Sequence, residues 1–426
     1  TMADEVLVFP LKCAVLNYAW GKVGSNSEVA DLAKCADPEF QVNEDAPYSE
    51  LWMGTHPNGP SKAVIAGREM TLEEWVKDHP DKLGPKVKEY FKGCLPYLFK
   101  VLSVNTSLSI QAHPNKVLAE KLHKERPDLY PDRNHKPEMA IALTPFQGLC
   151  GFRTIKDVAM YMQHIEELRA VVGINNALKL ITASKCMDMP MHREAMKNCF
   201  SFMMQRDKAT VEAELNKLIK RVRAMAEEGE NTSLYVWDVL SKLYEEFPGD
   251  VGCFAIYFLN VINLEPGEAM FLEANLPHAY LSGDCMECMA CSDNVVRAGL
   301  TLKYVDVHTL VEMLDYTGRP PSKTKFQGMK VTENGCNITM FRPHIPDFSV
   351  TMFEVPDNDT TCYIRAIDSA SILIIIQGEG QLTSRTLKEP LGIKRGSVLF
   401  IAANEGAEVE VTSEGMLMFR AQAGNV

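Results

Sequence analysis

The segment GEAMFLEANLPH (267–278) decides the fold, because it returns without gaps as GSVLFIAANEGA (396–407). Both copies read as a turn, an apolar strand and a second turn of small residues. Identical residues stand at equal spacing in the two copies, namely Gly267, Phe271, Ala274 and Asn275 in the first and Gly396, Phe400, Ala403 and Asn404 in the second. Self-similarity of this kind predicts two related β-barrels in one chain.

Upstream of the first copy, residues 156–250 have a pattern of apolar residues typical of helices rather than of strands. Apolar side chains recur there at helical spacing, as do Val211, Leu215, Leu218 and Val222. The block offers few candidate ligands, so we interpret it as a structural insertion of helices. Outside it, stretches such as PYLFKVLSV (96–104) predict strands, and TLEEWVKDHPDKLG (71–84) predicts a helix whose Thr71 and Glu74 form a capping box.

The charge balance excludes several kinds of partner. The 426 residues carry a net charge of −12 and contain no long basic tract, which excludes nucleic acid and anionic membrane surfaces. No apolar run is long enough for a membrane helix. The N-terminus shows no basic stretch followed by an apolar one, so no signal peptide is expected. Together with twelve cysteines, this predicts a reducing, cytoplasmic setting.

Three separated segments each direct polar side chains to one face of an extended chain. Alternate residues of a strand share a face. The side chains that share a face in this way are Ser109, Gln111 and His113 in the first segment, Lys136 and Glu138 in the second, and His278 and Tyr280 in the third. Because the backs of these segments are apolar, we expect the polar faces to line a common cavity.

Two imidazoles and one carboxylate form a typical divalent-metal set. His113, Glu138 and His278 suit catalytic zinc or non-haem iron. Gln111 as a further ligand would fill a position that an iron oxygenase keeps open for oxygen, which favours zinc. On the residues alone, two other interpretations stand beside this one: a core histidine bonded to the backbone, and Glu138 in a surface ion pair. In the second repeat Ala407 aligns with His278, so we expect that barrel to lack the metal ligands.

Longer blocks of sequence carry a family resemblance. These blocks are YAWG (18–21), YSELWMGTHP (48–57), QAHPNK (111–116), NHKPEMAIAL (134–143), GLCGFR (148–153), FLEANLPHAYLSGD (271–284) and ECMACSDNVVRAGL (287–300). In this order they resemble the signature blocks of type I mannose-6-phosphate isomerases, and the likeness continues into the last β region.

The resemblance implies a fold and a domain plan. It implies a mainly β chain with two cupin-type, jelly-roll barrels and an inserted α-helical domain. The catalytic cupin domain would be discontinuous, over residues 1–155 and 251–318, with the helical domain at 156–250. Residues 329–426 would form a C-terminal cupin-like domain without metal ligands.

The resemblance also implies a site. One Zn²⁺ per chain would be bound by Gln111, His113, Glu138 and His278. Arg297 and Lys136 would be catalytic, and the substrate pocket would comprise Trp20, Glu50, Lys100, Ser109, Tyr280, Glu287 and Asp293. Since an arginine stays charged at neutral pH, Arg297 would stabilise charge on the enediolate or orient the substrate rather than accept a proton. The residue that transfers the proton stays open among Lys136, His135, Glu287 and Asp293, and Lys100 and Ser109 are the candidates for the phosphate.

The implied function is the interconversion of mannose 6-phosphate and fructose 6-phosphate through a cis-enediol. The partner would then be a small hexose 6-phosphate, with no nucleic acid and no membrane, and the protein a monomer. The alternatives are a cupin-type iron oxygenase and a non-catalytic sugar-phosphate-binding cupin. Gln111 and the cations Lys136 and Arg297 argue against the oxygenase.

Overall fold

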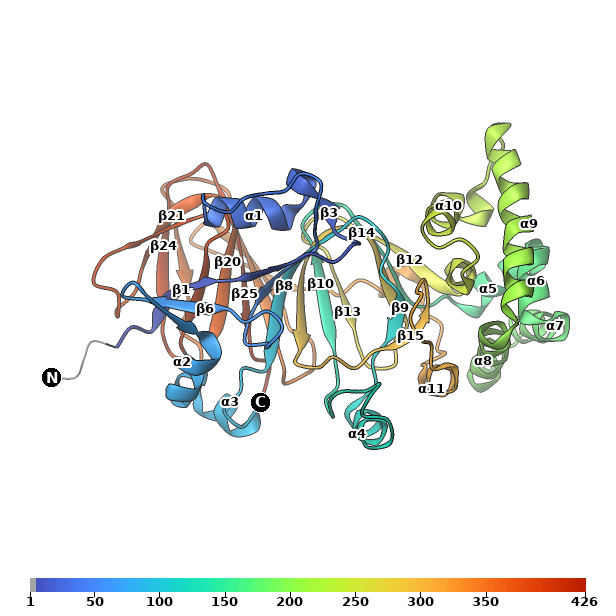
Figure 1. Cartoon of the computed structure of the whole chain (residues 1–426), viewed down its shortest axis with the longest axis horizontal. Coiled ribbons are helices and arrows are strands. Elements are labelled where there is room, and N and C mark those ends of the chain that lie inside the picture. Colours follow the sequence, from blue (N-terminus) through green and yellow to red (C-terminus); the bar gives the residue numbers. More distant parts are fainter. Residues whose placement is uncertain (1–4) are drawn as a thin grey trace.

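The computed structural model describes residues 5–426, which form an elongated molecule (Figure 1). Two β-rich regions lie next to each other, and a group of helices lies at one end. About 31% of the residues are in strands and 32% in helices. The expectation of a mainly β chain is therefore not confirmed, because helices contribute as much regular structure as strands.

The largest sheet near the metal-ligand candidates has ten strands. Its main path runs β12 (Leu259–Leu264), β11 (Phe146–Phe152), β14 (His278–Ala290), β8 (Tyr97–Val104), β5 (Glu50–Met53) and β2 (Ala14–Leu16). Off this path lie β10 (Glu138–Ala142), β13 (Ala269–Leu272), β9 (Ile110–Ala112) and β15 (Val296–Gly299). The long strand β14 pairs with β8, β9, β10 and β11, so it brings all the candidate segments together.

A nine-stranded sheet forms most of the second β region. Its order is β16 (Met329–Glu333), β17 (Cys336–Phe341), β18 (Ser349–Val355), β25 (Met416–Gln422), β20 (Ser371–Gln377), β23 (Val398–Ile401), β1 (Val8–Lys12), β6 (Lys62–Ile65) and β7 (Arg68–Thr71). Strand β1 pairs with β23, with Val8 opposite Ile401. The N-terminal strands therefore join the sheet of the C-terminal region.

Two smaller sheets complete the β structure. One has the order β19 (Thr361–Ile364), β24 (Ala407–Val411), β21 (Glu379–Thr383) and β22 (Leu391–Lys394). The other pairs β3 (Lys22–Val23) with β4 (Pro47–Tyr48). Strands from the four-stranded and nine-stranded sheets share one apolar core, which includes Leu373, Ile401 and Val409.

The sequence repeat is also a repeat of backbone geometry. Strand β13 corresponds residue for residue to β23, and β14 begins at His278 where β24 begins at Ala407. The turn glycines have φ of 88° at Gly267 and 89° at Gly396. The asparagines are left-handed in both copies, with φ of 66° at Asn275 and 64° at Asn404. This match confirms that the two segments are structural equivalents.

The insertion consists of six helices at one end of the molecule (Figure 1). They are α5 (Ile155–His164), α6 (Glu166–Val172), α7 (Ile174–Ala183), α8 (Met189–Gln205), α9 (Lys208–Glu227) and α10 (Trp237–Glu246). The expected apolar face of α9 is buried: Val211, Leu215, Leu218 and Val222 are at most 3% exposed. The other helices are α1 (Glu28–Ala36), α2 (Leu72–Asp78), α3 (Pro85–Tyr90), α4 (Lys116–Glu125) and α11 (Val307–Met313).

The helical insertion shares its core with the strands of the candidate site. One cluster contains helical residues such as Leu215 together with Ile110 and Ala112 of β9, Ala279 of β14 and Val296 of β15. The apolar backs of these strands therefore pack into the same core as the helices, while their other face carries the polar candidates. Among residues 5–426, no helix has the length and apolar character needed to cross a bilayer.

Candidate metal centre

Three of the expected ligands converge in a buried cluster. His113 and His278 each have Nε2 3.4 Å from an oxygen of Glu138, one histidine on each carboxylate oxygen. The candidate donor atoms of all three side chains lie within 4.8 Å of one another. The side chains are at most 7% exposed. Among the described residues, they form the one group of three or more His, Cys, Asp or Glu with this geometry.

Both imidazoles are held with one nitrogen directed at the cluster. His113 Nδ1 lies 2.8 Å from the Asn294 carbonyl, and His278 Nδ1 lies 2.8 Å from the Leu276 carbonyl. A carbonyl only accepts, so both Nδ1 atoms carry the proton. The two Nε2 atoms are buried and have no hydrogen-bond partner. Burial also lowers the pKa of His113, so its neutral, metal-binding form prevails. The donors present therefore fit a divalent metal ion.

Gln111, Arg297 and His278 occupy matching register positions on three adjacent strands. Gln111 of β9 is directly opposite His278 of β14 and directly opposite Arg297 of β15. Residues opposite each other in antiparallel strands have their side chains on the same face. Since His278 faces the cluster, the side chains of Gln111 and Arg297 are on that face too.

Arg297 is a cation without a protein partner. Its side chain makes no hydrogen bond or ion pair with any residue in 5–426. Partial burial lowers the pKa of its guanidinium. It lines a hollow of about 180 Å³ together with Tyr130, Lys303 and Tyr304. Asp306 lines the same hollow but forms no ion pair with Arg297, so the half-buried guanidinium is available to an anionic ligand.

A second cluster of polar side chains comes from the neighbouring strands β8, β5 and β14. Lys100 Nζ is 3.2 Å from Glu50 Oε1 and 3.8 Å from Glu287 Oε1. It also lies 4.6 Å from the ring centre of Trp52. Tyr280 donates its hydroxyl to Glu287 Oε2 at 2.5 Å. Buried charges and hydrogen bonds thus link four of the expected pocket residues into one network.

Burial and neighbouring charges perturb the ionisable groups of this network. Burial alone would lower the pKa of Lys100, but Glu50 and Glu287 raise it above its ordinary value. Burial and the charge of Glu138 raise the pKa of Glu287 to about 7, against the opposing effects of Lys100 and Tyr280. Burial would likewise raise the pKa of Glu138, but His113 and His278 hold it well below the ordinary value. The carboxylates Glu138 and Glu287 therefore differ in proton affinity, as acid–base pairs in enzymes do.

The residues just before β10 divide between two regions. Lys136 Nζ lies 3.6 Å from Glu138 Oε1, so it is directed toward the metal-ligand candidates. His135 Nε2 lies 2.8 Å from Asp347 Oδ1, a buried carboxylate of the C-terminal region. His135 therefore faces away from the cluster, as alternation along the chain predicts.

The remaining expected residues lie at the periphery. Trp20 is half-buried, in contact with the apolar cluster that contains Tyr280. Ser109 precedes β9 rather than lying within it and is half-buried. Asp293 is 53% exposed, and His56 Nε2 lies 3.0 Å from its carboxylate. That hydrogen bond from His56 is the main cause of the lowered pKa of Asp293.

Comparison with known proteins identifies the family. A model of the type I phosphomannose isomerase catalytic domain matches residues 8–155, and a model of the helical insertion domain of the same family matches residues 171–259. The mannose-6-phosphate isomerase of Bos taurus is 52% identical over 97% of this chain and 98% of its own length. The Homo sapiens enzyme is 50% identical over the same shares. The chain belongs to the type I phosphomannose isomerase family.

Solved structures of phosphomannose isomerases have the same fold. A zinc-bound mannose 6-phosphate isomerase aligns with a TM-score of 0.79 at 29% identity, over 99% of this chain and all of that one. A mutant of the Salmonella typhimurium phosphomannose isomerase aligns with a TM-score of 0.80 at 28% identity, over the same shares.

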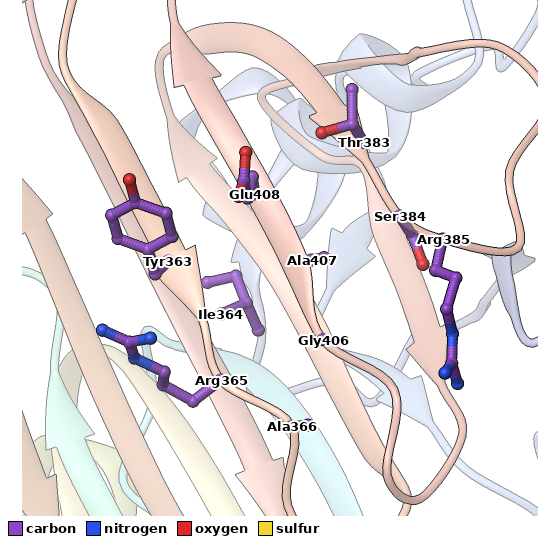
Figure 2. Close-up of a pocket in the computed structure, with 10 residues that line it drawn as sticks. All are labelled: Tyr363, Ile364, Arg365, Ala366, Thr383, Ser384, Arg385, Gly406, Ala407 and Glu408. Atoms are coloured by element: carbon purple, nitrogen blue, oxygen red, sulfur yellow. The ribbon is translucent and has the colours of Figure 1, made fainter.

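The C-terminal region of this phosphomannose isomerase family member has a hollow of its own. It measures about 460 Å³ and lies along β19, β24 and β21 (Figure 2). Ala407, which replaces the repeat's histidine, lines it. Its two arginines are paired, Arg365 with Glu333 at 2.6 Å and Arg385 with Glu405 at 2.5 Å. This hollow therefore offers neither the imidazole nor the free cation of the first site.

Sequence reasoning missed three residues that contact the site of this family member. His56 binds Asp293, Asn294 holds His113, and Asp132 holds Asn294. His56 and Asn294 fall inside blocks that carried the family resemblance, yet no pattern of spacing assigned them a role. Their partners lie far away in sequence, so only the folded arrangement reveals the contacts.

Proposed function

We propose that this chain interconverts mannose 6-phosphate and fructose 6-phosphate, using one zinc ion bound by Gln111, His113, Glu138 and His278. The observation that carries the proposal is the buried cluster of His113, Glu138 and His278, whose two Nε2 atoms lack any hydrogen-bond partner. The activity printed for relatives about 50% identical over nearly the whole chain supports the choice of substrate.

Zinc fits this set of donors better than iron. A neutral amide oxygen beside two imidazoles and one carboxylate leaves room for a substrate oxygen on a four-coordinate to five-coordinate zinc. When bound, the ion would polarise the sugar oxygens and so lower the energy of the negative charge that develops on them. The zinc-bound relative with the same fold supports this choice.

The reaction moves one proton between C1 and C2 and a second proton between the oxygens on these carbons, through a cis-enediol. Arg297 is on the same face as Gln111 and His278 and has no protein carboxylate beside it, so it would stabilise the enediolate. Glu287 is the base candidate that we favour, because its pKa of about 7 permits both acceptance and return of a proton near neutral pH. Lys136 would add positive charge next to Glu138.

Other polar residues would bind the sugar phosphate. Lys100 and Ser109 are our candidates for phosphate contacts, as a cation and a hydroxyl. Glu50 and Tyr280 would hold Lys100 and Glu287 in position through the contacts described above. Trp20 and Asp293 would border the opening.

The domain plan and the setting complete the proposal. We propose a discontinuous catalytic cupin barrel over residues 1–155 and 251–318, a helical domain at 156–250 and a second jelly-roll barrel at 329–426. The family matches at 8–155 and 171–259 support the first two parts. The enzyme would be a cytoplasmic monomer.

A coupled assay tests the function. Fructose 6-phosphate formed from mannose 6-phosphate is measured for the purified protein, for the protein after chelation, and after stepwise return of zinc. We expect activity to disappear on chelation and to return in proportion to zinc occupancy, reaching full recovery at one ion per chain. Turnover that survives complete metal removal would contradict the proposal. Metal analysis of the purified protein distinguishes zinc from the iron of an oxygenase.

A further inference from the structure

Two loops beside the proposed metal centre are joined by one carboxylate. Asp132, in the loop that leads into Lys136 and Glu138, accepts a hydrogen bond from Ser292 Oγ at 2.8 Å. It also accepts from the Asp293 backbone N–H at 2.8 Å and from Asn294 Nδ2 at 3.0 Å. The backbone N–H of Asn134 is a fourth donor, at 2.9 Å. One half-buried carboxylate thus organises both loops.

The loop around Asn294, to which Asp132 is hydrogen-bonded, also provides the acceptor for His113, one of the proposed metal ligands. The Asn294 carbonyl lies 2.8 Å from His113 Nδ1. Asn294 is fully buried, and its side-chain amide also donates to the Asn134 carbonyl at 3.0 Å. Asn294 therefore cannot rotate its carbonyl away from His113 without breaking bonds to the 131–135 loop.

The direction of His113 Nε2 depends on this arrangement. An imidazole that donates from Nδ1 to a fixed acceptor keeps its tautomer and its ring plane, and both determine where the Nε2 lone pair is directed. The buried Nε2 of His113 makes no hydrogen bond that would orient the ring, and its polar neighbour Glu138 Oε1 lies 3.4 Å away. The position of the Asn294 carbonyl is therefore the main local constraint on this ligand.

We propose that Asp132 is a positioning residue for the metal centre, acting through Asn294 on His113. The proposal rests on the proposed function for the identity of the metal, zinc. It adds a residue that contacts neither substrate nor metal and that holds together the two loops leading to Lys136, Glu138 and Arg297. The carboxylate is required, because its two oxygens receive four donors.

The substitution Asp132→Asn tests this. It keeps the shape but replaces one accepting oxygen with a donor, which then faces an N–H or O–H. The zinc dissociation constant of the full-length apoprotein is measured by competition with a chromophoric chelator. We expect it to rise by about 10-fold, the lower end of the effect of losing the direct partner of a metal-bound histidine, because the Asn294 carbonyl shifts rather than disappears. At saturating zinc, most of the turnover number should return, which separates positioning from catalysis.

A matched control separates positioning from general loss of stability. Asp207 caps α9 and likewise accepts from a backbone N–H and a hydroxyl, both of Thr210. Asp207→Asn makes the same chemical change at a helix cap far from the cluster and should leave the zinc dissociation constant unchanged. Should Asp132→Asn fail to fold, Asn294→Ala keeps the carbonyl but removes its anchoring amide, and it should weaken zinc binding in the same direction.

Two outcomes would overturn the inference. One is an unchanged zinc dissociation constant in Asp132→Asn, or in Asn294→Ala if that variant is the one tested. The other is an equal rise in Asp207→Asn, which would indicate a general structural effect. Failure of the proposed function would be distinct: the wild-type protein would bind zinc with the expected affinity yet form no fructose 6-phosphate.

Discussion

The hydroxyl of Tyr280 controls the charge of Glu287 more directly than any other neutral group in the site. It donates to Glu287 Oε2 at 2.5 Å, and this hydrogen bond opposes the rise in the pKa of Glu287 that burial causes. A donor to a carboxylate favours its ionised form. Tyr280 therefore helps to keep the proposed base ionised at neutral pH.

The first prediction concerns Tyr280→Phe. If Glu287 accepts the proton, turnover falls as the pH drops below the pKa of its carboxyl, which burial raises above the ordinary value. Loss of the hydroxyl raises that pKa, so the acidic limb of the pH–kcat profile of the zinc-loaded enzyme should move to higher pH, by roughly one unit. Lys100→Met should shift the limb in the same direction, since it removes the cation beside Glu287. An acidic limb that stays in place in both variants would exclude Glu287 as the base.

The second prediction concerns Arg297→Lys. Lysine keeps the charge but loses the planar fork that reaches two oxygens at once. We expect kcat to fall by about 100-fold, in the range seen when one electrostatic contact to a transition state is lost. Zinc content should be unchanged, because no hydrogen bond or ion pair joins the Arg297 side chain to a candidate ligand. A kcat equal to that of the wild type would remove Arg297 from the mechanism.

Sequence alone reached the candidate ligands but not the groups that contact them. His113, Glu138 and His278 were predictable because alternation along extended segments assigns their faces, and the family blocks then gave their roles. The contacts of Asn294 with Asp132 and with His113 span 162 and 181 positions, and that of His56 with Asp293 spans 237. Such contacts depend on how loops meet in the folded chain, and no local pattern records them.

At the scale of the structural elements, the equivalent turns of the two repeat copies each contain a residue with a positive φ, a conformation that only glycine adopts easily. At Gly396 φ is 89°, and an added Cβ would lie 2.4 Å from the Leu32 carbonyl of α1. Gly67 has a similar φ of 76°, but an added Cβ would meet nothing within 4 Å. Alanine substitutions at these two positions therefore distinguish the cost of backbone strain alone from the cost of strain together with a steric clash.

The third prediction compares Gly396→Ala with Gly67→Ala. Left-handed backbone alone should destabilise Gly67→Ala by about 1 kcal/mol. Gly396→Ala adds the clash with α1, so we expect a loss of roughly 3 kcal/mol or more, measured by urea unfolding of the zinc-loaded protein. Equal losses in the two variants would show that α1 moves away freely.

Element types were more predictable than element lengths. One half of the expected capping box forms at the start of α2, where Thr71 Oγ1 accepts from the Glu74 N–H at 3.1 Å. The extended segment expected to present Ser109, Gln111 and His113 is a regular strand only over Ile110–Ala112, which form β9. Pro114 lacks an N–H to continue a ladder after His113. Ser109 and His113 therefore lie on irregular backbone at the two ends of β9.

At the scale of the whole molecule, the N-terminal strands make the least predictable connection. Strand β1 pairs with β23 across nearly 400 positions, for example Phe9 with Phe400. No repeat or motif marks that pairing, because it depends on complementary edges rather than on local sequence. This pairing joins the N-terminal segment, which precedes the candidate metal ligands in the sequence, to the C-terminal sheet.

The fourth prediction concerns the metal and the stability of the whole chain. His113, Glu138 and His278 come from segments before and after the helical insertion, and the backs of β9 and β14 share one apolar core with its helices. Because the zinc site exists only in the folded chain, zinc should raise the melting temperature. At a free zinc concentration 100 times the dissociation constant, the stabilisation should be about 2.7 kcal/mol.

His278→Ala should abolish this dependence on zinc together with the activity, since it removes one donor from the buried cluster. His164→Ala is the matched control, because His164 is an exposed residue of α5 that bonds only its own helix, at the Met160 carbonyl. Its melting temperature should rise with zinc as in the wild type. A zinc-dependent rise of the same size in His278→Ala would mean that the ion binds elsewhere. Zinc-independent melting of the wild type would mean that the cluster does not bind the ion tightly enough to stabilise the fold.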